Sequence, residues 1–564
     1  MSFPVDLFVQ RLGHANAATG GSAAPALAPL PPLAPIAAID VGSNSIHMIV
    51  VAPEANGAYR VLGREREMVR LGRSAFGLVG AGGDLSEKAM EDGLLALVKM
   101  ITLASLRGAG RIVAVATSAV REAGNGEEFL ARVRAQTGVE VQRLSGEDEG
   151  ALIYRAVREV VDLGSGDAGI IDVGGGSTEW VTTHQGELGS VVSLALGSLR
   201  CSGSLSGDPP GARTIDRLRR TIRERLKAEV PKRKISRLVA TSGTAVCCAD
   251  LVAHFLAEEK AAGRSATRSG APAAPPARTA KSGLREVKLR DLSALVLRLT
   301  RMPRAEIAAL PSVGPPRAES LLAGAILIEQ LVRHAGVARF LVSDRALREG
   351  LVLAALGQPI PRGADPDDLR RRQVLRLAER AESVHPHGLQ TARLAVRLFD
   401  LTASLHGLGR REREWLEYAA LLHDIGYSIH YQKHHEHSFY LIQNAALDAF
   451  DPSEVEIVAR VALFHRGASP KPGHPVLAGS KPWQQQTIRT LAALLRVADA
   501  LDRTHASRVE QLYCSIRPKR VKLEVISPWA VDLELDAAIE HGRLFEKVFQ
   551  RRLSVRQGLE AASS

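Results

Sequence analysis

Short apolar runs separated by polar, glycine-containing turns recur in the N-terminal half of the chain. Ile36–Ile39 and Ile46–Val51 flank one such turn, and Gly169–Ile171 and Trp180–Thr183 flank another. Short apolar runs that end in glycine turns are typical of strands joined as hairpins. The pattern therefore predicts two hairpins of similar layout, far apart in the sequence.

The segments around these hairpins alternate between strand-like and helix-like patterns. Further strands are predicted at Arg111–Thr117, Val139–Val141, Arg237–Thr241 and Phe340–Ser343. Helices are predicted around Phe129, from about Gly150, and over Arg345–Leu356. Strands that alternate with helices form α/β domains. This part of the chain is therefore predicted to be α/β.

The pattern changes from Ala364 onward. Helical periodicity dominates Asp367–Ala506 without a convincing strand, which indicates a separate all-helical domain. After Val509, two strand-like runs precede a helical segment at Ala537–Phe549. These runs, Cys514–Ile516 and Val521–Val525, predict a small α+β region.

A chain of 564 residues is too long for one hydrophobic core, so several domains are expected. Residues 1–35 are rich in Ala and Pro and are predicted to be a disordered extension. The predicted domains are 36–156 and 157–363 (both α/β), 364–508 (helical) and 509–564 (α+β). A second Ala/Pro/Arg-rich stretch, 258–283, is predicted to be a flexible insertion in the second α/β domain.

Charge and composition narrow the class of partner. The formal net charge is +12, which favours a polyanionic partner, although an Arg-rich composition without a focused patch would give the same value. Aromatic residues make up only 4% of the chain, so a nucleic-acid binder that stacks bases on aromatic rings is not expected. Arginines 370–372 and 410, 411 and 413 could line a channel for a polyanion or form a solvated helix face.

Cysteine usage and the N-terminus bear on the compartment. The four cysteines contain no C-x-x-C pair, which predicts a reducing compartment without structural disulfides. The first residues carry no basic segment typical of a secretory signal, and prolines interrupt the apolar stretch 23–38. We therefore expect a cytoplasmic protein that does not interact with membranes.

The two glycine turns carry the chemistry. Asp172–Glu179 contains Gly174, Gly175 and Gly176 followed by Ser177 and Thr178, and such a turn exposes backbone N–H groups to an anion. Carboxylates beside a phosphate site are suited to holding a metal ion or positioning water. By itself, this turn is more consistent with an ordinary glycine-rich hairpin.

A second turn repeats the layout and favours a phosphate site. Asp40–Ser45 contains Gly42, Ser43, Asn44 and Ser45 between two apolar runs. Neither turn is a Walker A motif, because no Gly-Lys-Ser/Thr follows. Two Asp-x-Gly hairpins of this kind indicate similar halves that face one phosphate chain.

The ordered motifs resemble the exopolyphosphatase/guanosine pentaphosphate phosphohydrolase (Ppx/GppA) family over about residues 36–360. The motifs are Asp40–Ser45, Thr117–Arg121, Ser145–Glu149, Asp172–Glu179, Thr241–Thr244, Arg317–Glu319 and Ser343–Gly350. The resemblance implies two actin/Hsp70-like domains (the ASKHA, ribonuclease H-like type) with the active site in the cleft between them. It also implies a homodimer.

The resemblance assigns roles to several residues. Glu149 is implied as the general base and Glu179 as a second acid near metal and water. Asp40 and Asp172 are implied as ligands of Mg²⁺ (or Mn²⁺). Arg121 is implied as the clamp on the terminal phosphate. The remaining expected phosphate-binding residues are Gly42, Ser43, Asn44, Ser45, Gly174, Gly175, Gly176, Ser177, Thr178, Arg70 and Arg317.

Two positions depart from the family pattern. The family often has Asn-Glu-Glu-Ala or a similar run where this chain has Glu147–Gly150, so the base is Glu149 or a neighbour one residue away. Glu319 replaces the more usual Asp. We place Glu149 in a loop between a strand and a helix, where it can enter a cleft. The alternative is a helix N-terminal acid favoured by the helix dipole.

The helical region carries a second set of metal-ligating residue types. His387, His423-Asp424 and Asp499 lie on separate predicted helices and resemble the H…HD…D pattern of HD-superfamily phosphohydrolases. Imidazole and carboxylate ligands from separate helices can hold a divalent cation. The histidines 434, 435, 437 and 465 offer ligands for a second divalent metal. HD-like domains in this family can also be degenerate and serve to bind the substrate chain.

The resemblance therefore implies an exopolyphosphatase that releases orthophosphate from inorganic polyphosphate with Mg²⁺. The alternative substrate is guanosine pentaphosphate (pppGpp), hydrolysed by the same residues. A non-catalytic polyphosphate or nucleotide sensor and a kinase of the same fold are less consistent with the acids at 149 and 179. The expected partner is thus polyphosphate or (p)ppGpp rather than nucleic acid.

Overall fold

The computed structural model describes residues 34–53, 59–76, 83–164, 166–265, 284–357, 366–381, 386–445, 447, 449–471 and 473–558. The predicted extension 1–35 falls almost wholly outside these ranges, as does most of the predicted insertion 258–283. The chain forms two compact units, and their main boundary lies between Asp365 and Pro366. We describe each unit by itself.

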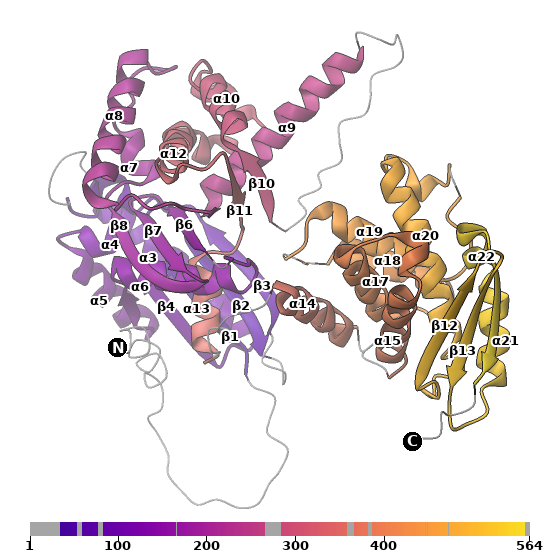
Figure 1. Ribbon diagram of the computed structural model, residues 1–564. Helices are drawn as coiled ribbons and strands as arrows, with labels where there is room; N and C mark the ends of the chain where they lie inside the picture. The colour runs from indigo at the N-terminus through magenta and orange to yellow at the C-terminus, as the bar shows by residue number, and fades with distance from the viewer. Residues whose placement is uncertain are drawn as a thin grey trace, which may run out of the picture. The chain divides into compact units, whose positions relative to one another are not determined.

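The first unit contains two sheets of the same design (Figure 1). The first sheet consists of β1 (Ile36–Val41), β2 (Ile46–Pro53), β3 (Tyr59–Glu67), β4 (Arg111–Ala116) and β5 (Val141–Arg143). Its order is β3-β2-β1-β4-β5. Strands β1 to β3 pair antiparallel, whereas β4 pairs parallel with β1 and β5 pairs parallel with β4.

The second sheet repeats this order and adds an edge strand. It consists of β6 (Asp167–Val173), β7 (Thr178–His184), β8 (Glu187–Leu194), β9 (Arg237–Thr241), β10 (Arg285–Lys288) and β11 (Arg339–Val342). Its order is β10-β11-β9-β6-β7-β8, with β9 parallel to β6 and β11 parallel to β9. The β8-β7-β6-β9-β11 part matches the first sheet. Two ribonuclease H-like domains of the actin/Hsp70 type are therefore present, as predicted.

Helices cover both sheets. The helices of this unit are α2 (Gly72–Ala75), α3 (Glu87–Leu106), α4 (Ser118–Glu122), α5 (Gly126–Thr137), α6 (Gly146–Arg158), α7 (Ser198–Ser202), α8 (Ala212–Glu229), α9 (Gly243–Ser265), α10 (Leu289–Leu299), α11 (Arg304–Ala309), α12 (Gly314–Ala335) and α13 (Leu347–Ala355). Residues 258–265 of the predicted insertion form the end of α9. Helix α13 packs on β1 and α6, although it lies within the range expected for the second domain.

The central strands are buried on both faces because their side chains enter two different cores. On β1, Ile36 and Ala38 belong to the core that also contains residues of α6 and α13. Ala37, Ile39 and Val41 belong to the core under α3 and α5. This period of two across a sheet covered on both faces explains the continuous apolar runs in the sequence.

The second unit begins with a helical domain. Its helices are α14 (Pro366–Arg380), α15 (Pro386–Leu401), α16 (Ala403–His406), α17 (Arg410–Leu422), α18 (His434–Gln443), α19 (Pro452–Leu463) and α20 (Pro482–Ala500), with short 3₁₀ turns η1 (Ile425–Ser428) and η2 (Pro475–Leu477). The helix-rich character predicted for this region is confirmed.

The α+β region at the C-terminus has one strand more than predicted. It contains β12 (Gln511–Arg517), β13 (Arg520–Ile526), α21 (Asp532–His541), α22 (Arg543–Phe549) and β14 (Arg552–Gln557). Strand β14 pairs parallel with β13, which also pairs antiparallel with β12. Leu523 and Phe545 share one core with helical residues such as Leu494, so this region and the helical domain form a single compact unit.

Among the described residues, no helix is both long enough and apolar enough to cross a membrane.

Candidate active site and metal centre

The two glycine turns meet in the first unit. A cavity of about 470 Å³ is lined by residues from both turns, including Asp40, Ser43, Asp172 and Gly175. A Cβ at Gly175 would lie 3.1 Å from the Cβ of Ser43 and 3.4 Å from the backbone N of Asn44. The turns therefore approach so closely that a larger residue at 175 would push them apart. Two predicted phosphate loops face one cavity.

Further contacts hold the turns in register. Ser43 and Ser118 share a hydrogen bond of 3.1 Å between their hydroxyl oxygens, which connects the first turn to α4. The backbone N–H groups of Ser198 and Leu199 donate to the carbonyls of Gly174 and Gly175, so the start of α7 supports the second turn. The first turn is therefore anchored to α4 and the second to α7.

Three buried carboxylates next to the turns have oxygen atoms without hydrogen-bond partners. These atoms are Asp40 Oδ1, Asp172 Oδ1 and Glu179 Oε2. A buried, unpartnered carboxylate oxygen is costly, and a divalent cation offers one way to satisfy it. Asp40 and Asp172 line the cavity itself. Their oxygen donors thus fit the Mg²⁺ or Mn²⁺ that the sequence predicts.

Burial shifts the protonation of these three acids. Burial raises the pKa of Asp40 to about 7, although the positive charge of Arg348 acts to lower it. Burial raises the pKa of Asp172 to about 6. Burial and the charge of Asp172 raise the pKa of Glu179 to about 7. A cation at this position would favour the charged forms and reverse these shifts.

Glu149 is not in a loop as predicted. It lies in the first turn of α6, whose N-cap is Ser145, and its side chain is buried but lines the cavity. The run Glu147–Glu149 begins the helix because its carboxylates interact favourably with the helix dipole. This is the helix N-terminal position of the alternative prediction, and because the helix begins at the cavity wall, it also leaves Glu149 at the cavity.

Arg121 holds Glu149. Its Nη1 donates to Glu149 Oε2 over 3.1 Å and to the carbonyl of Leu144 over 3.0 Å. Burial and the charge of Glu179 raise the pKa of Glu149 well above its ordinary value, and the arginine opposes that rise. A carboxyl group with a raised pKa is suited to exchange a proton near neutral pH.

Not every predicted residue reaches the cavity wall. The wall includes Gly42, Ser43, Asn44, Ser45, Gly174, Gly175, Gly176, Ser177 and Arg317, but not Thr178, Arg70, Arg121 or Glu179. The hydroxyl of Thr178 donates to the carbonyl of Leu196, so it supports the hairpin. Arg70 forms an ion pair of 3.3 Å with Glu319 on α12.

Residues that were not predicted complete the wall. Arg66 and Arg348 lie beside His47, whose Nδ1 accepts from Arg348 over 3.3 Å. The other ring nitrogen of His47 then donates to the hydroxyl of Ser45 over 2.7 Å. Burial and three arginines, led by Arg348, lower the pKa of His47 to about 3. The wall therefore carries several positive charges, as an anion site requires.

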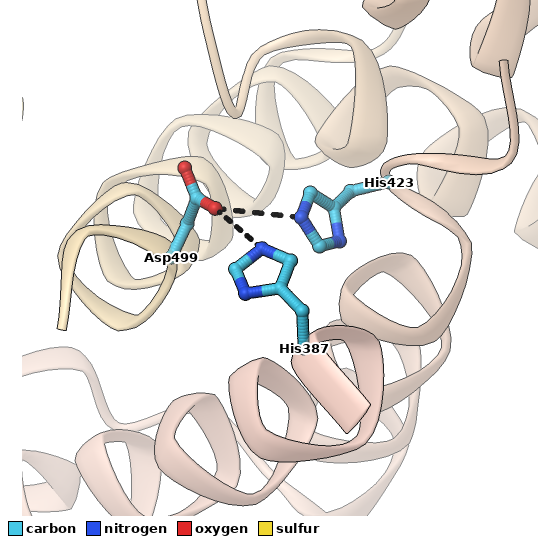
Figure 2. A group of neighbouring side chains, drawn as sticks. All are labelled: His387, His423 and Asp499. Carbon is cyan, nitrogen blue, oxygen red and sulfur yellow. Dashed lines mark hydrogen bonds and ion pairs between the residues drawn. The ribbon is translucent and has the colours of Figure 1, made fainter. Parts of the chain in front are cut away.

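In the second unit, the predicted ligands His387, His423, Asp424 and Asp499 come together. Figure 2 shows one carboxylate oxygen of Asp499 between the rings of His387 and His423. It lies 3.2 Å from His387 Nε2 and 3.4 Å from His423 Nε2. Asp424 Oδ2 lies 3.4 Å from His423 Nε2. Helix α15, the end of α17 and helix α20 supply these side chains.

Hydrogen bonds orient the two histidines. Nδ1 of His423 donates to the carbonyl of Ala420 over 2.7 Å, which leaves Nε2 to face Asp424 and Asp499. Nδ1 of His387 contacts the buried Asp502 at 2.9 Å, and His505 stacks on its ring. Support of this kind is typical of metal-bound histidine. The residues present therefore fit a divalent cation.

The arginine clusters of this unit are engaged in ion pairs. Arg370 pairs with Glu414 and Glu454, and Arg411 also pairs with Glu454. Arg413 pairs with Asp400. Arg370 is itself buried, so its ion pairs favour a structural role over the lining of a channel for a polyanion.

Comparison with known proteins assigns the chain to a family. The Ppx/GppA phosphatase family matches residues 50–358, and domain III of Ppx/GppA phosphatases matches residues 369–539. The chain belongs to the Ppx/GppA phosphatase family. The cleft of the first unit is thus the candidate active site of a phosphatase.

Curated relatives agree with the Ppx/GppA assignment. Exopolyphosphatase 1 of Mycobacterium tuberculosis is 33% identical over 319 residues, which are 56% of this chain and 87% of that relative. Exopolyphosphatase 1 of Mycobacterium leprae is 32% identical over 56% of this chain and 88% of that relative. The family and these relatives support phosphatase activity on polyphosphate or pppGpp.

Solved structures of the family are also similar. A Ppx/GppA enzyme of Aquifex aeolicus is 25% identical, with a TM-score of 0.46, over 57% of this chain and 99% of that structure. An exopolyphosphatase of Cytophaga hutchinsonii is 23% identical, with a TM-score of 0.49, over 58% of this chain and 99% of that structure.

Proposed function

We propose that the cleft removes the terminal phosphate of inorganic polyphosphate and releases orthophosphate, with Mg²⁺ as the cation. The observation that carries the proposal is the meeting of two glycine turns beside three buried carboxylate oxygens without partners. Ppx/GppA phosphatases generally depend on a divalent metal. The cation would neutralise phosphate charge next to Asp40 and Asp172.

The residues of this chain supply the remaining steps. Backbone N–H groups of the two turns bind the phosphate oxygens, and Arg317 and Arg348 add positive charge from the wall. Glu149 accepts a proton from the attacking water, whose oxygen forms a bond to the terminal phosphorus. The bridging P–O bond breaks, and the shortened chain leaves with its oxygen. Arg121 stabilises the charge that develops during this step.

We propose polyphosphate rather than pppGpp as the substrate because of the residue types in the cavity wall. Among the described residues that line it, none is Phe, Tyr or Trp, so none of these large rings is offered to a guanine base. The similar proteins of Mycobacterium tuberculosis and Mycobacterium leprae also carry the name exopolyphosphatase.

The direct test measures orthophosphate release by the full chain from long-chain polyphosphate and from pppGpp at equal concentrations of terminal phosphate, with Mg²⁺. The proposal expects the larger kcat/KM for polyphosphate. Release from pppGpp alone would replace polyphosphate by the nucleotide, and release from neither would overturn the catalytic assignment.

We further propose that His387, His423, Asp424 and Asp499 hold a divalent cation in the second unit. The unpartnered Nε2 of His423, which is buried between two carboxylates, supports this proposal. Retention of Mn²⁺ by the dialysed chain, and its loss in His423→Ala, would test it.

We propose a cytoplasmic location, supported by four unpaired cysteines. The homodimer stays a prediction.

A further inference from the structure

His47 lies near the start of β2 and faces the cleft. It is the cross-strand partner of Asp40, and directly opposite residues of an antiparallel pair point to the same face of a sheet. Its side chain is half-buried and lines the cavity. The run in which it lies, Ile46–Val51, contains no other polar residue. A polar ring at this one position therefore belongs to the cleft and not to the core of the sheet.

The second hairpin has an acid at the equivalent position. Asp172 pairs with Glu179 across β6 and β7 as Asp40 pairs with His47 across β1 and β2. Both hairpins have the same number of residues between the paired positions, so His47 and Glu179 correspond. The two halves of the cleft therefore differ in chemistry at this position, with an imidazole in one and a carboxyl group in the other.

Arg348 determines which nitrogen of His47 carries the proton. Its Nη1 lies 3.3 Å from His47 Nδ1, and His47 Nε2 lies 2.7 Å from Ser45 Oγ. A guanidinium group only donates hydrogen bonds, so Nδ1 holds the lone pair and Nε2 carries the proton of the neutral ring. Burial and three arginines, led by Arg348, lower the pKa of His47 to about 3. The ring is therefore neutral near neutral pH and donates to Ser45.

The hydrogen bond from His47 leaves the Ser45 hydroxyl with a free proton. The Ser45 oxygen accepts from Nε2, so its own proton points elsewhere. Within the described ranges this hydroxyl has no other hydrogen-bond partner, although Ser45 is buried and lines the cavity. A buried donor without an acceptor is costly. An acceptor atom of a ligand in the cavity would satisfy it.

Hydroxyl groups of the second half are directed toward the protein instead. Ser193 Oγ donates to Glu179 Oε1 over 2.9 Å. Burial raises the pKa of Glu179, and the hydroxyls of Ser177 and Ser193 oppose that rise, as donors beside a carboxylate do. The sequence position of Ser177 in its hairpin is that of Ser45 in the first. The two equivalent serines thus lie beside residues of opposite hydrogen-bonding character, a donor at Ser45 and an acceptor at Ser177.

We propose that His47 is a positioning residue, which makes the Ser45 hydroxyl a permanent hydrogen-bond donor to a phosphate oxygen of the substrate. The inference rests on the proposed function of the cleft and assigns phosphate oxygens to the side of the first turn. Ionised phosphate oxygens only accept hydrogen bonds, and a donor that is already oriented needs no rearrangement when they bind. Arg348 acts through the ring, because it prevents the opposite tautomer.

Two substitutions of nearly equal size test the direction of this hydrogen bond. His47→Gln can accept from Arg348 through its amide oxygen and donate to Ser45 through its amide nitrogen, as the ring does. His47→Glu can accept from Arg348 but cannot donate, so the Ser45 proton turns toward position 47. We expect KM for polyphosphate to stay close to that of the unsubstituted chain in His47→Gln. In His47→Glu it should rise about tenfold, the contribution of one hydrogen bond to a charged group.

The same pair in a Ser45→Ala chain separates hydrogen-bond direction from charge and from folding. Without the hydroxyl there is no proton to direct, so the difference in KM between His47→Gln and His47→Glu should shrink. A purely structural role would lower the melting temperature and raise KM in both variants alike. His184→Gln, at the exposed far end of β7, is the control and should leave KM unchanged. An equal difference with and without Ser45, or equal KM values for the two variants, would overturn the proposal.

A binding measurement distinguishes this inference from the proposed function. Tripolyphosphate with Mg²⁺ is titrated by calorimetry into the full chain carrying Glu149→Gln, which lacks the proposed base. The affinity that Ser45→Ala removes belongs to the cleft, and we expect His47→Glu to remove it as well and His47→Gln to keep it. This pattern in a chain that releases no orthophosphate without Glu149→Gln would support the inference and overturn the proposed function. Equal affinities in all of these variants, or no binding, would overturn the inference.

Discussion

Arg121 Nη1 and Glu149 Oε2 lie 3.1 Å apart, in a hydrogen bond between helices α4 and α6. The contact joins the proposed phosphate clamp to the proposed base, although the two residues are 28 positions apart in the sequence. Arg121 itself does not line the cavity, but it contacts Glu149, which does, and it limits the rise in the pKa of Glu149 that burial causes.

Glu149→Gln should abolish most hydrolysis in the cleft while the fold is kept. The amide can still accept a hydrogen bond from Arg121 but cannot take a proton from water. We expect kcat for polyphosphate to fall by about 10²- to 10⁴-fold. The exposed neighbour Glu147 in the same helical turn provides the control Glu147→Gln. If Asp148→Asn, rather than Glu149→Gln, removes the activity, the base lies one residue away.

Replacement of Arg121 should change both rate and pH dependence. Without the guanidinium, burial and Glu179 act on Glu149 unopposed, so its pKa rises and the base is deprotonated only at higher pH. Arg121→Ala should lower kcat on the order of 10²-fold and move the acidic limb of the kcat/KM profile to higher pH.

Arg121→Lys should recover part of both effects, because the charge is kept. Arg143→Ala removes an arginine that pairs with the exposed Glu127 and serves as the control. An unchanged profile in Arg121→Ala would show that the arginine does not act through Glu149.

Much of this site was predictable because its chemistry depends on local motifs. The turns at Asp40–Ser45 and Asp172–Glu179 could be recognised, since each consists of neighbouring residues between two apolar strands. The face-to-face approach of Gly175 and Ser43 could not be recognised from the sequence, because it depends on how two domains pack. His47 gave a weak signal, a polar residue in the apolar run Ile46–Val51. Its partner Arg348 lies 301 positions away.

In the fold, too, the elements encoded by local sequence were predicted and those that depend on distant residues were not. Strands such as β1 and β6 were predicted because both of their faces are buried and the sequence is apolar throughout. Strand β14 was missed, although Leu553 and Val555 alternate with polar residues. Its partner β13 pairs with it in parallel across two intervening helices, and a connection of that kind leaves no turn signal. The sharing of one core by the helical domain and this region is likewise non-local.

Glu319→Gln should improve substrate binding in the cleft. Glu319 on α12 pairs with Arg70 at 3.3 Å and with Arg73 at 3.6 Å. If Arg70 contacts phosphate as predicted, it must first leave this partner. Removal of the charge should therefore lower KM for polyphosphate by about two- to fivefold. This factor corresponds to the free energy of a partly exposed ion pair.

The exposed Glu306 on the neighbouring helix α11 offers the matched control, Glu306→Gln. A raised KM in Glu319→Gln would contradict a competition between Glu319 and phosphate for Arg70. It would indicate instead that the ion pair positions Arg70 for the phosphate.

The metal-free protein should lose stability as the pH rises toward neutrality. Burial raises the pKa values of Asp40 and Glu179 to about 7 and that of Asp172 to about 6. Carboxyl groups in an unfolded chain titrate near pH 4, so between about pH 4 and 7 the folded state binds more protons. The free energy of unfolding therefore decreases with pH over this window.

Mg²⁺ should reverse the effect above pH 7, because it binds the deprotonated carboxylates in the folded state only. Calorimetric melting of the EDTA-treated chain at pH 5.5 and 7.5, with and without Mg²⁺, measures both effects. Asp172→Asn removes one of the three buried acids and should flatten the pH dependence. Because Asp172 lies in the cleft, a flattened curve would assign the effect to the cleft and not to the histidine cluster of the second unit. A melting temperature that rises from pH 5.5 to 7.5 without metal would show that these acids are already charged in the empty cleft.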